Sequence, residues 1–194
     1  YPNKSIAGET LKEKRAKLAE KKKSKKRKAQ GGPSSAAPSQ DQINNLIENY
    51  QAGRLREAEA LATSLTQQFP RHPFGWTVLG AVFKQMGRLS ESLAPKQKAA
   101  ELSPHDAEAH NNLANTLKEL GRLDEAEASL RQAIALKPDF AKAHSNLGNT
   151  LKALGRLEEA EASLRQAITL KPDFAEAHSN LGSTLKALGR LEEA

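Results

Sequence analysis

Apolar residues between positions 41 and 194 recur with the spacing of amphipathic helices. Leu113, Leu117 and Leu120 are three or four residues apart and therefore share one face of a helix. Further along, Ala126 and Leu130 share a face of a second helix. Glu, Lys, Arg and Gln, which are good helix formers, fill many of the remaining positions. The pattern predicts an all-α chain.

Signals for the ends of these helices accompany the apolar pattern. Gly121 suits the left-handed turn that ends a helix, so the first helix should cover roughly residues 107–120. Asp124 is the expected N-cap of the second helix. That helix should end near Lys137, because Pro138 prevents its extension. The unit is predicted to be a helix-turn-helix.

The same signals return at a fixed interval along the chain. Residues 111–144 and 145–178 differ at only six of 34 positions. Gly-Arg-Leu begins at Gly53, Gly87, Gly121, Gly155 and Gly189, and the closing prolines are Pro70, Pro104, Pro138 and Pro172. Small residues recur at two expected helix crossings: Gly80, Ala114, Gly148 and Gly182 at one, and Ala99, Ala133 and Ala167 at the other. A fixed period of this length predicts a stack of repeats.

The spacing resembles the tetratricopeptide repeat family, whose units have fixed positions for aromatic, small and closing proline residues. The matching positions in the unit that begins at Ala141 are His144, Leu147, Gly148, Leu151, Ala160, Leu164, Ala167 and Pro172. The resemblance covers about residues 41–194. It implies a right-handed α-α superhelical solenoid of about four repeats and a partial one, open at its C-terminal end, that binds other polypeptides.

The first two units depart from the pattern. In the unit from Pro73, Trp76 occupies the aromatic position, Ser92 replaces a small alanine, and Pro95 falls inside the second helix. Pro95 should remove one hydrogen bond and bend that helix. The unit at about 41–72 is interpreted as a divergent N-terminal cap, since end repeats of solenoids are usually atypical.

The positive charge is concentrated at the N-terminus. Residues 1–30 contain 12 basic and three acidic residues, whereas residues 31–194 contain 18 and 20. Residues 1–30 are predicted to be a tail that is disordered or helical on binding, and 31–40 a flexible linker. A dense block could bind nucleic acid or an anionic surface, act as a nuclear localisation signal or simply be solvated. It consists of Lys21, Lys22, Lys23, Lys25, Lys26, Arg27 and Lys28.

An asparagine recurs at one first-helix position, as Asn112, Asn146 and Asn180. This Asn-Leu-Gly/Ala pattern resembles the repeat arm of O-GlcNAc transferase, in which an asparagine ladder lines the concave surface and holds the backbone of an extended peptide. The resemblance implies the same role here, since one amide can both donate and accept hydrogen bonds. The alternative is that near-identical repeats inherited a surface asparagine by duplication.

Further groove residues are expected beside the ladder. They are Asn115, Asn149, Lys118, Lys152 and Lys186. The lysine row favours an acidic or carboxylate-bearing ligand, although such rows are often only solvated.

His110, His144 and His178 hold the position of Trp76 in successive units. One histidine per repeat is spread along the stack, so we interpret these residues as repeat packing and expect no metal site. The chain has no cysteine, which excludes disulfides and thiolate chemistry.

No catalytic constellation is visible, so neither an enzyme nor a cofactor is expected. No apolar run spans a membrane and no signal peptide is visible, which predicts a cytoplasmic protein. The favoured function is a protein-interaction scaffold that binds an extended peptide, as the N-terminal part of a larger protein such as a glycosyl- or sulfotransferase. Two alternatives remain open: a structural protein that stacks end to end into a filament, and a nucleic-acid-associated adaptor.

Overall fold

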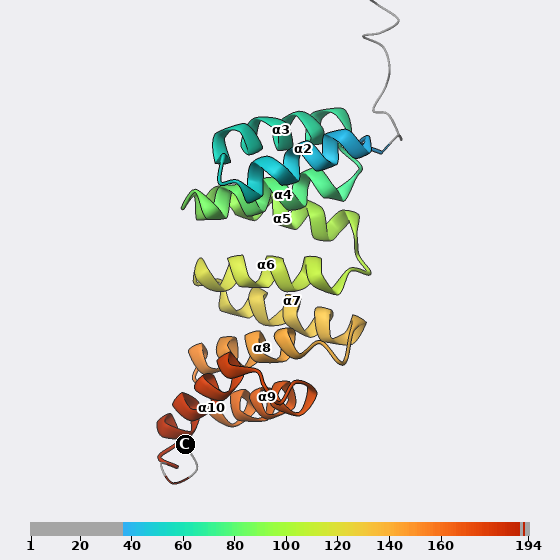
Figure 1. Cartoon of the computed structure of the whole chain (residues 1–194). Helices are drawn as coiled ribbons and strands as arrows, with labels where there is room; N and C mark the ends of the chain where they lie inside the picture. Colours follow the sequence, from blue (N-terminus) through green and yellow to red (C-terminus); the bar gives the residue numbers. More distant parts are fainter. Residues whose placement is uncertain (1–36, 191, 193–194) are drawn as a thin grey trace, which may run out of the picture. The chain divides into compact units, whose positions relative to one another are not determined.

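The computed structural model describes residues 37–190 and residue 192, and the secondary structure of this part of the chain is α-helical (Figure 1). The predicted basic tail and residues 31–36 of the predicted linker lie outside these residues. The described helices are α2 (Gln40–Gln51), α3 (Leu55–Gln68), α4 (Pro73–Gln85), α5 (Leu89–Leu102), α6 (Ala107–Glu119), α7 (Leu123–Leu136), α8 (Ala141–Ala153), α9 (Leu157–Leu170) and α10 (Ala175–Ala187).

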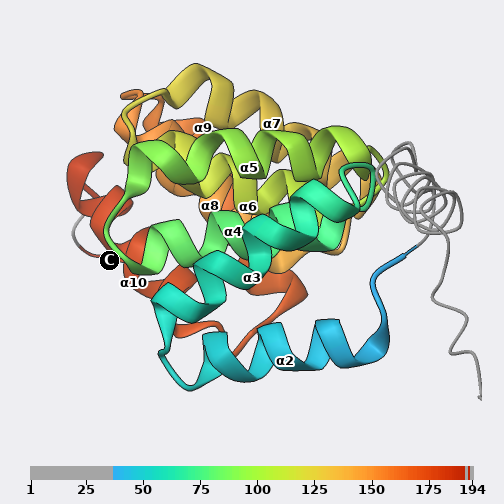
Figure 2. The ribbon, with the colours of Figure 1, turned by 90° about the horizontal axis from the view of Figure 1, so that it is seen from above.

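Each helix packs against the next one in the sequence, so the described helices stack in order from α2 and α3 to α10 (Figure 1). The even-numbered helices are the first helices of the repeats and the odd-numbered ones are the second helices. In Figure 2, α5, α7 and α9 lie on one side of α4, α6 and α8. First helices also contact each other directly, α6 with α8 and α8 with α10. The prediction of an all-α stack of helix-turn-helix repeats is confirmed.

Glycine makes the turn inside each repeat, as predicted. Gly121 has φ +76°, a backbone conformation that favours glycine. Its N–H donates to Lys118 O at 3.0 Å, and the next N–H, of Arg122, donates to Leu117 O at 2.9 Å. These two bonds satisfy carbonyl groups that the end of α6 would otherwise leave unpaired. The same left-handed glycine recurs at the other four Gly-Arg-Leu motifs.

The prediction that Asp124 caps the second helix is wrong. Helix α7 begins one residue earlier, at Leu123, and its N-cap residue, Arg122, makes no side-chain capping bond. The chain passes through the glycine turn directly into the helix, which leaves Asp124 inside the first helical turn. A carboxylate there still interacts favourably with the positive end of the helix dipole.

The core of the described residues consists mainly of leucine and alanine at the predicted crossings. Ala114, Ala133 and Ala167, at the predicted crossings, are fully buried. Two clusters of buried apolar residues form, one over residues 46–82 and one over 107–160. Helix α5 lies between them and continues from Leu89 to Leu102 through Pro95. The apolar core is therefore interrupted at the least regular helix of the stack.

Candidate functional site

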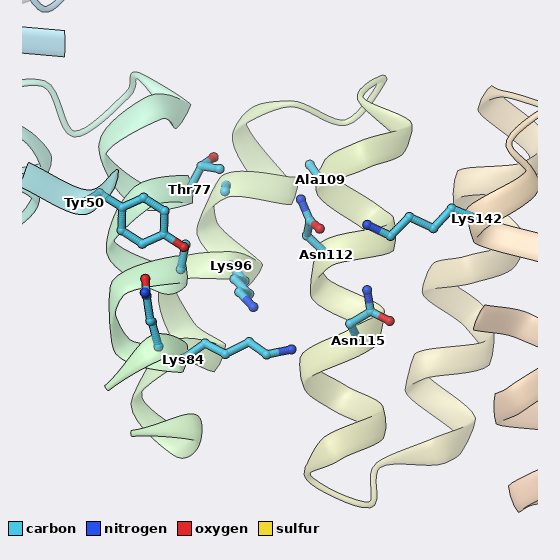
Figure 3. Close-up of a pocket in the computed structure, with 11 residues that line it drawn as sticks. Tyr50, Thr77, Lys84, Lys96, Ala109, Asn112, Asn115 and Lys142 are labelled. Carbon is cyan, nitrogen blue, oxygen red and sulfur yellow. The ribbon is translucent and has the colours of Figure 1, made fainter. Parts of the chain in front are cut away.

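A cavity of about 480 Å³ opens on the side of the stack formed by the first helices. Helices α4 and α6 form most of its wall. The residues labelled around it in Figure 3 are Tyr50 of α2, Thr77 and Lys84 of α4, Lys96 of α5, Ala109, Asn112 and Asn115 of α6, and Lys142 of α8. Direct contact between α4 and α6 is weaker than between the later first helices, which leaves room for the cavity.

Two of the predicted groove residues border this cavity. Asn112 and Asn115 are both half-buried, and they lie one turn apart on α6. The side-chain amide of neither residue is hydrogen-bonded within the described part of the chain. Both amides can therefore donate to and accept from a ligand in the cavity.

Asn146 is placed differently although it occupies the same register position as Asn112. Its side chain is buried, with 6% of the residue exposed. The amide Nδ2 donates to Oδ1 of Asn111 at 2.8 Å, across the interface between α6 and α8. The donor side of this predicted ladder residue is thus used to hold two repeats together.

Asn180 is intermediate between these two cases. The residue is half-buried, and its Nδ2 is shielded from solvent without a hydrogen-bond partner. The position across the interface, which Asn111 holds one repeat earlier, is occupied by Ser145. Ser145 Oγ is also buried without a partner. The shorter serine side chain explains why the bond made by Asn146 is not repeated by Asn180.

The remaining predicted residues lie along the same first helices but outside the cavity wall. Asn149 and Lys118 are half-buried, and Lys186 is exposed. Lys152 Nζ donates to Ser183 Oγ of α10 at 2.6 Å. The cavity is instead bordered by Lys84, Lys96 and Lys142.

The sequence analysis did not predict these three lysines as groove residues. For Lys84 and Lys96, the repeat register of the sequence contained an indication. Lys84 lies one full repeat before Lys118, so the predicted lysine row could have been extended to it. Lys96 lies one full repeat before Leu130, where the later repeats have a core leucine. Lys142 replaces a glutamate of the neighbouring repeats, Glu108 and Glu176, and its place beside the cavity follows only from the structure.

The recurring histidines make one structural hydrogen bond per repeat. Trp76 Nε1 donates to Pro70 O at 3.0 Å. The Nε2 atoms of the three histidines make the same contact with the carbonyl of the closing proline, at 3.1 Å for His110, 2.9 Å for His144 and 2.8 Å for His178. Their interpretation as repeat packing is confirmed. The described residues include no group of three His, Asp or Glu side chains arranged to hold a metal ion.

The fold and the groove together define a helix-turn-helix repeat scaffold. A model described as TPR repeat matches residues 114–155 and 148–189, and one described as Tetratricopeptide repeat matches residues 97–128. Residues 97–189 of the chain therefore consist of tetratricopeptide repeats. No curated protein matches its sequence significantly. No described helix has the length and apolar character needed to cross a membrane.

Similar solved structures have low sequence identity to the chain. A crystal structure of MamA protein is 21% identical, with a TM-score of 0.72 over 78% of this chain and 83% of that one. YrrB, described as a TPR protein with an unusual peptide-binding site, is 20% identical, with a TM-score of 0.68 over 80% of each chain. The first TPR of Spaghetti (RPAP3), bound to the HSP90 peptide SRMEEVD, is 26% identical, with a TM-score of 0.58 over 60% of this chain and 93% of that one.

Proposed function

We propose that the protein is a peptide-binding scaffold that holds an extended segment of a partner along its first helices. The cavity between α4 and α6 is the centre of the proposed site. The observation that carries the proposal is the pair of amides of Asn112 and Asn115, which border a cavity of about 480 Å³ and have no internal hydrogen-bond partner.

Two similar structures support a peptide as the ligand. YrrB is described as having an unusual peptide-binding site, and the RPAP3 repeat domain is bound to a peptide. A solenoid has no deep pocket for a whole folded domain, whereas a row of parallel first helices offers contacts along an extended chain.

The proposed ladder of Asn112, Asn146 and Asn180 would act unevenly. Asn112 is open to a ligand, whereas the unpaired amide nitrogen of Asn180 is shielded from solvent. Asn146 would have to exchange its bond with Asn111 for a bond to the peptide. Asn149, Lys118, Lys152 and Lys186 would extend the same surface. The resemblance of the ladder to the O-GlcNAc transferase arm is the basis for the narrower hypothesis of a transferase substrate-binding arm.

Substitution of the two cavity asparagines tests the proposal. Peptides would first be selected from a random display library on the full chain. Their affinities would then be measured by fluorescence anisotropy for Asn112→Ala combined with Asn115→Ala. Each lost hydrogen bond is worth about 0.5–1.5 kcal/mol, so we expect the loss of two to weaken affinity about 5- to 150-fold with unchanged helicity.

A matched control is available on the second helices. Gln132 and Gln166 are equivalent exposed residues of α7 and α9, and replacing both by alanine should leave affinity unchanged. Binding that survives the asparagine substitutions but is weakened by the glutamine substitutions would place the ligand on the opposite side and refute the proposed site.

The alternative functions remain predictions from the sequence. The basic block of residues 21–28 lies outside the described residues, so the structure adds nothing to the hypothesis of a nucleic-acid adaptor. End-to-end assembly depends on residues around the chain end, where 191, 193 and 194 are not described.

A further inference from the structure

Lys96 occupies a position that belongs to a core leucine in the later repeats. Leu130 and Leu164, at the same register position of the next two repeats, are 1% and 0% exposed, and Lys96 is itself only 8% exposed. The stem of Lys96 packs as leucine does. A Cβ added to Gly80 would lie 2.7 Å from Lys96 Cγ, and one added to Gly148 would lie 2.5 Å from Leu164 Cγ. The lysine therefore comes from the second helix and passes the first helix at a glycine.

The additional length of the lysine carries its ammonium group to the cavity wall. Lys96 Nζ donates to Thr116 Oγ1 of α6 at 2.6 Å. An ammonium group has three N–H donors, so two remain after this bond. Lys96 also lines the cavity, as do the two asparagines of α6 (Figure 3). The geometry leaves the unused donors beside the space in which a ligand would lie.

The cavity supplies no counter-charge to this ammonium. Its lining contains Lys84, Lys96 and Lys142 and no aspartate or glutamate. The carboxylate that acts on Lys96 electrostatically is Glu119, which is paired with Lys84. Burial, together with the neighbouring charge of Lys84, lowers the pKa of Lys96 to about 8. A buried charge without a partner is costly, and an anion bound nearby would remove part of that cost.

We propose that Lys96 forms an anion subsite of the groove, which binds a single carboxylate of the peptide ligand. This inference rests on the proposed peptide-binding function. The carboxylate would accept from the Lys96 ammonium, and the amides of Asn112 and Asn115 would hold the adjoining peptide backbone. Both an acidic side chain and a C-terminal carboxylate have this chemistry.

The experiment uses the full chain labelled with ¹³C at the lysine Cε atoms, with the Lys96 signal assigned by its loss in Lys96→Leu. Three pentapeptides serve as probes: one with a central glutamate and blocked ends, one of glycines with a free C-terminal carboxylate, and one of glycines with both ends blocked. We expect a saturable shift of the Lys96 signal, and a higher pKa of Lys96, with at least one carboxylate peptide. The fully blocked peptide should give neither effect. The more effective carboxylate peptide identifies the source of the anion.

Two variants separate a specific site from general attraction to a basic protein. Lys96→Leu installs the residue that the later repeats carry, so the fold should be retained. It should weaken binding of the preferred carboxylate peptide about tenfold or more, as expected for a hydrogen bond to a charged group. Lys98→Leu, on the same helix, removes an ammonium that is bonded to Glu101, and it should leave the affinity unchanged.

Equal affinity of the carboxylate and fully blocked peptides, or equal affinity of Lys96→Leu and the native chain, would overturn the inference. The scaffold proposal would survive that result if binding remained sensitive to Asn112→Ala with Asn115→Ala. Conversely, a saturable carboxylate effect at Lys96 combined with insensitivity to the asparagine substitutions would support the anion subsite and refute the peptide-backbone site.

Discussion

The repeat formed by α4 and α5 and the repeat formed by α8 and α9 have nearly the same backbone but different interiors. Each consists of a 13-residue and a 14-residue helix, joined at a glycine with φ +75° or +77°. The earlier repeat nevertheless contains Lys96 where the later one has Leu164, and Pro95 inside its second helix. A few turn and crossing residues therefore determine the repeat geometry, and the positions between them are free to change the chemistry of the groove.

The contact between neighbouring repeats differs in the same region. Arg156 reaches back to Glu127 of the preceding repeat, at 2.7 Å, and Arg88 reaches Glu59 in the same way, at 2.8 Å. At the matching position before Arg122 the chain has Leu93, which packs against the apolar cluster of the following repeats. An ion pair at this boundary is thus replaced by an apolar contact. The repeat that carries Lys96 is therefore joined to the following repeat by an apolar contact of Leu93 at this position, without the ion pair.

The largest effect is expected when the lysine is moved into the regular repeat. Leu164→Lys would remove a fully buried leucine and place an ammonium group in an apolar site. Apolar burial alone is worth about 1.5–3 kcal/mol, and desolvation of the charge adds to this. We expect urea unfolding to show a loss of about 3 kcal/mol or more. A loss below about 1 kcal/mol would show that a repeat tolerates a lysine at this position without the polar partner and the cavity that Lys96 has.

The reciprocal substitution, Lys96→Leu, should stabilise the chain. Replacing the ammonium by a leucine that fits the same register is expected to gain about 1–2 kcal/mol at pH 7. The gain should depend on pH, because the pKa of Lys96 is about 8 in the folded chain and 10.5 is the ordinary value for an unfolded one. Below pH 8 the folded chain bears the full cost of the charge. Between pH 8 and 10.5 only the folded state loses the proton, so the native chain gains stability relative to the variant.

Urea titrations of both chains at pH 7 and pH 10 measure this difference. Lys84 and Glu119 are the charged groups that act on Lys96, and both are present in the two chains, so their contributions largely cancel. A stability difference that is the same at both pH values would contradict a buried ammonium at Lys96.

These comparisons also show which features could be read from the sequence. The turn glycines and the histidine packing could be predicted because each depends on a local requirement that recurs with the period. The cap predicted at Asp124 was wrong because the glycine turn brings Arg122 to the N-cap position and leaves Asp124 inside the first turn of α7. Lys96 was missed because the site prediction rested on residues that recur in every repeat, and Lys96 replaces a recurring leucine.

The asparagines could not be ranked from the sequence for a different reason. Asn112, Asn146 and Asn180 occupy the same register position of successive repeats. Whether the amide of each is hydrogen-bonded depends on the residue opposite it on the preceding first helix. That residue is Asn111 for Asn146 and Ser145 for Asn180, and only the first pair forms a bond. Pairwise contacts of this kind arise from the stacking of two repeats and are not visible in the periodicity of one.

The smallest of the expected effects tests that pairwise explanation. Ser145→Asn would place opposite Asn180 the residue that Asn146 already meets, and it should restore the missing bond to the buried Nδ2 of Asn180. The expected gain is about 0.5–1.5 kcal/mol in urea unfolding, the net value of one hydrogen bond. The mirror variant, Asn111→Ser, should cost a similar amount because it leaves Asn146 Nδ2 buried without its partner. If Ser145→Asn is neutral while Asn111→Ser is destabilising, the unpaired groups at Asn180 and Ser145 have another cause, such as a water molecule that already bridges them.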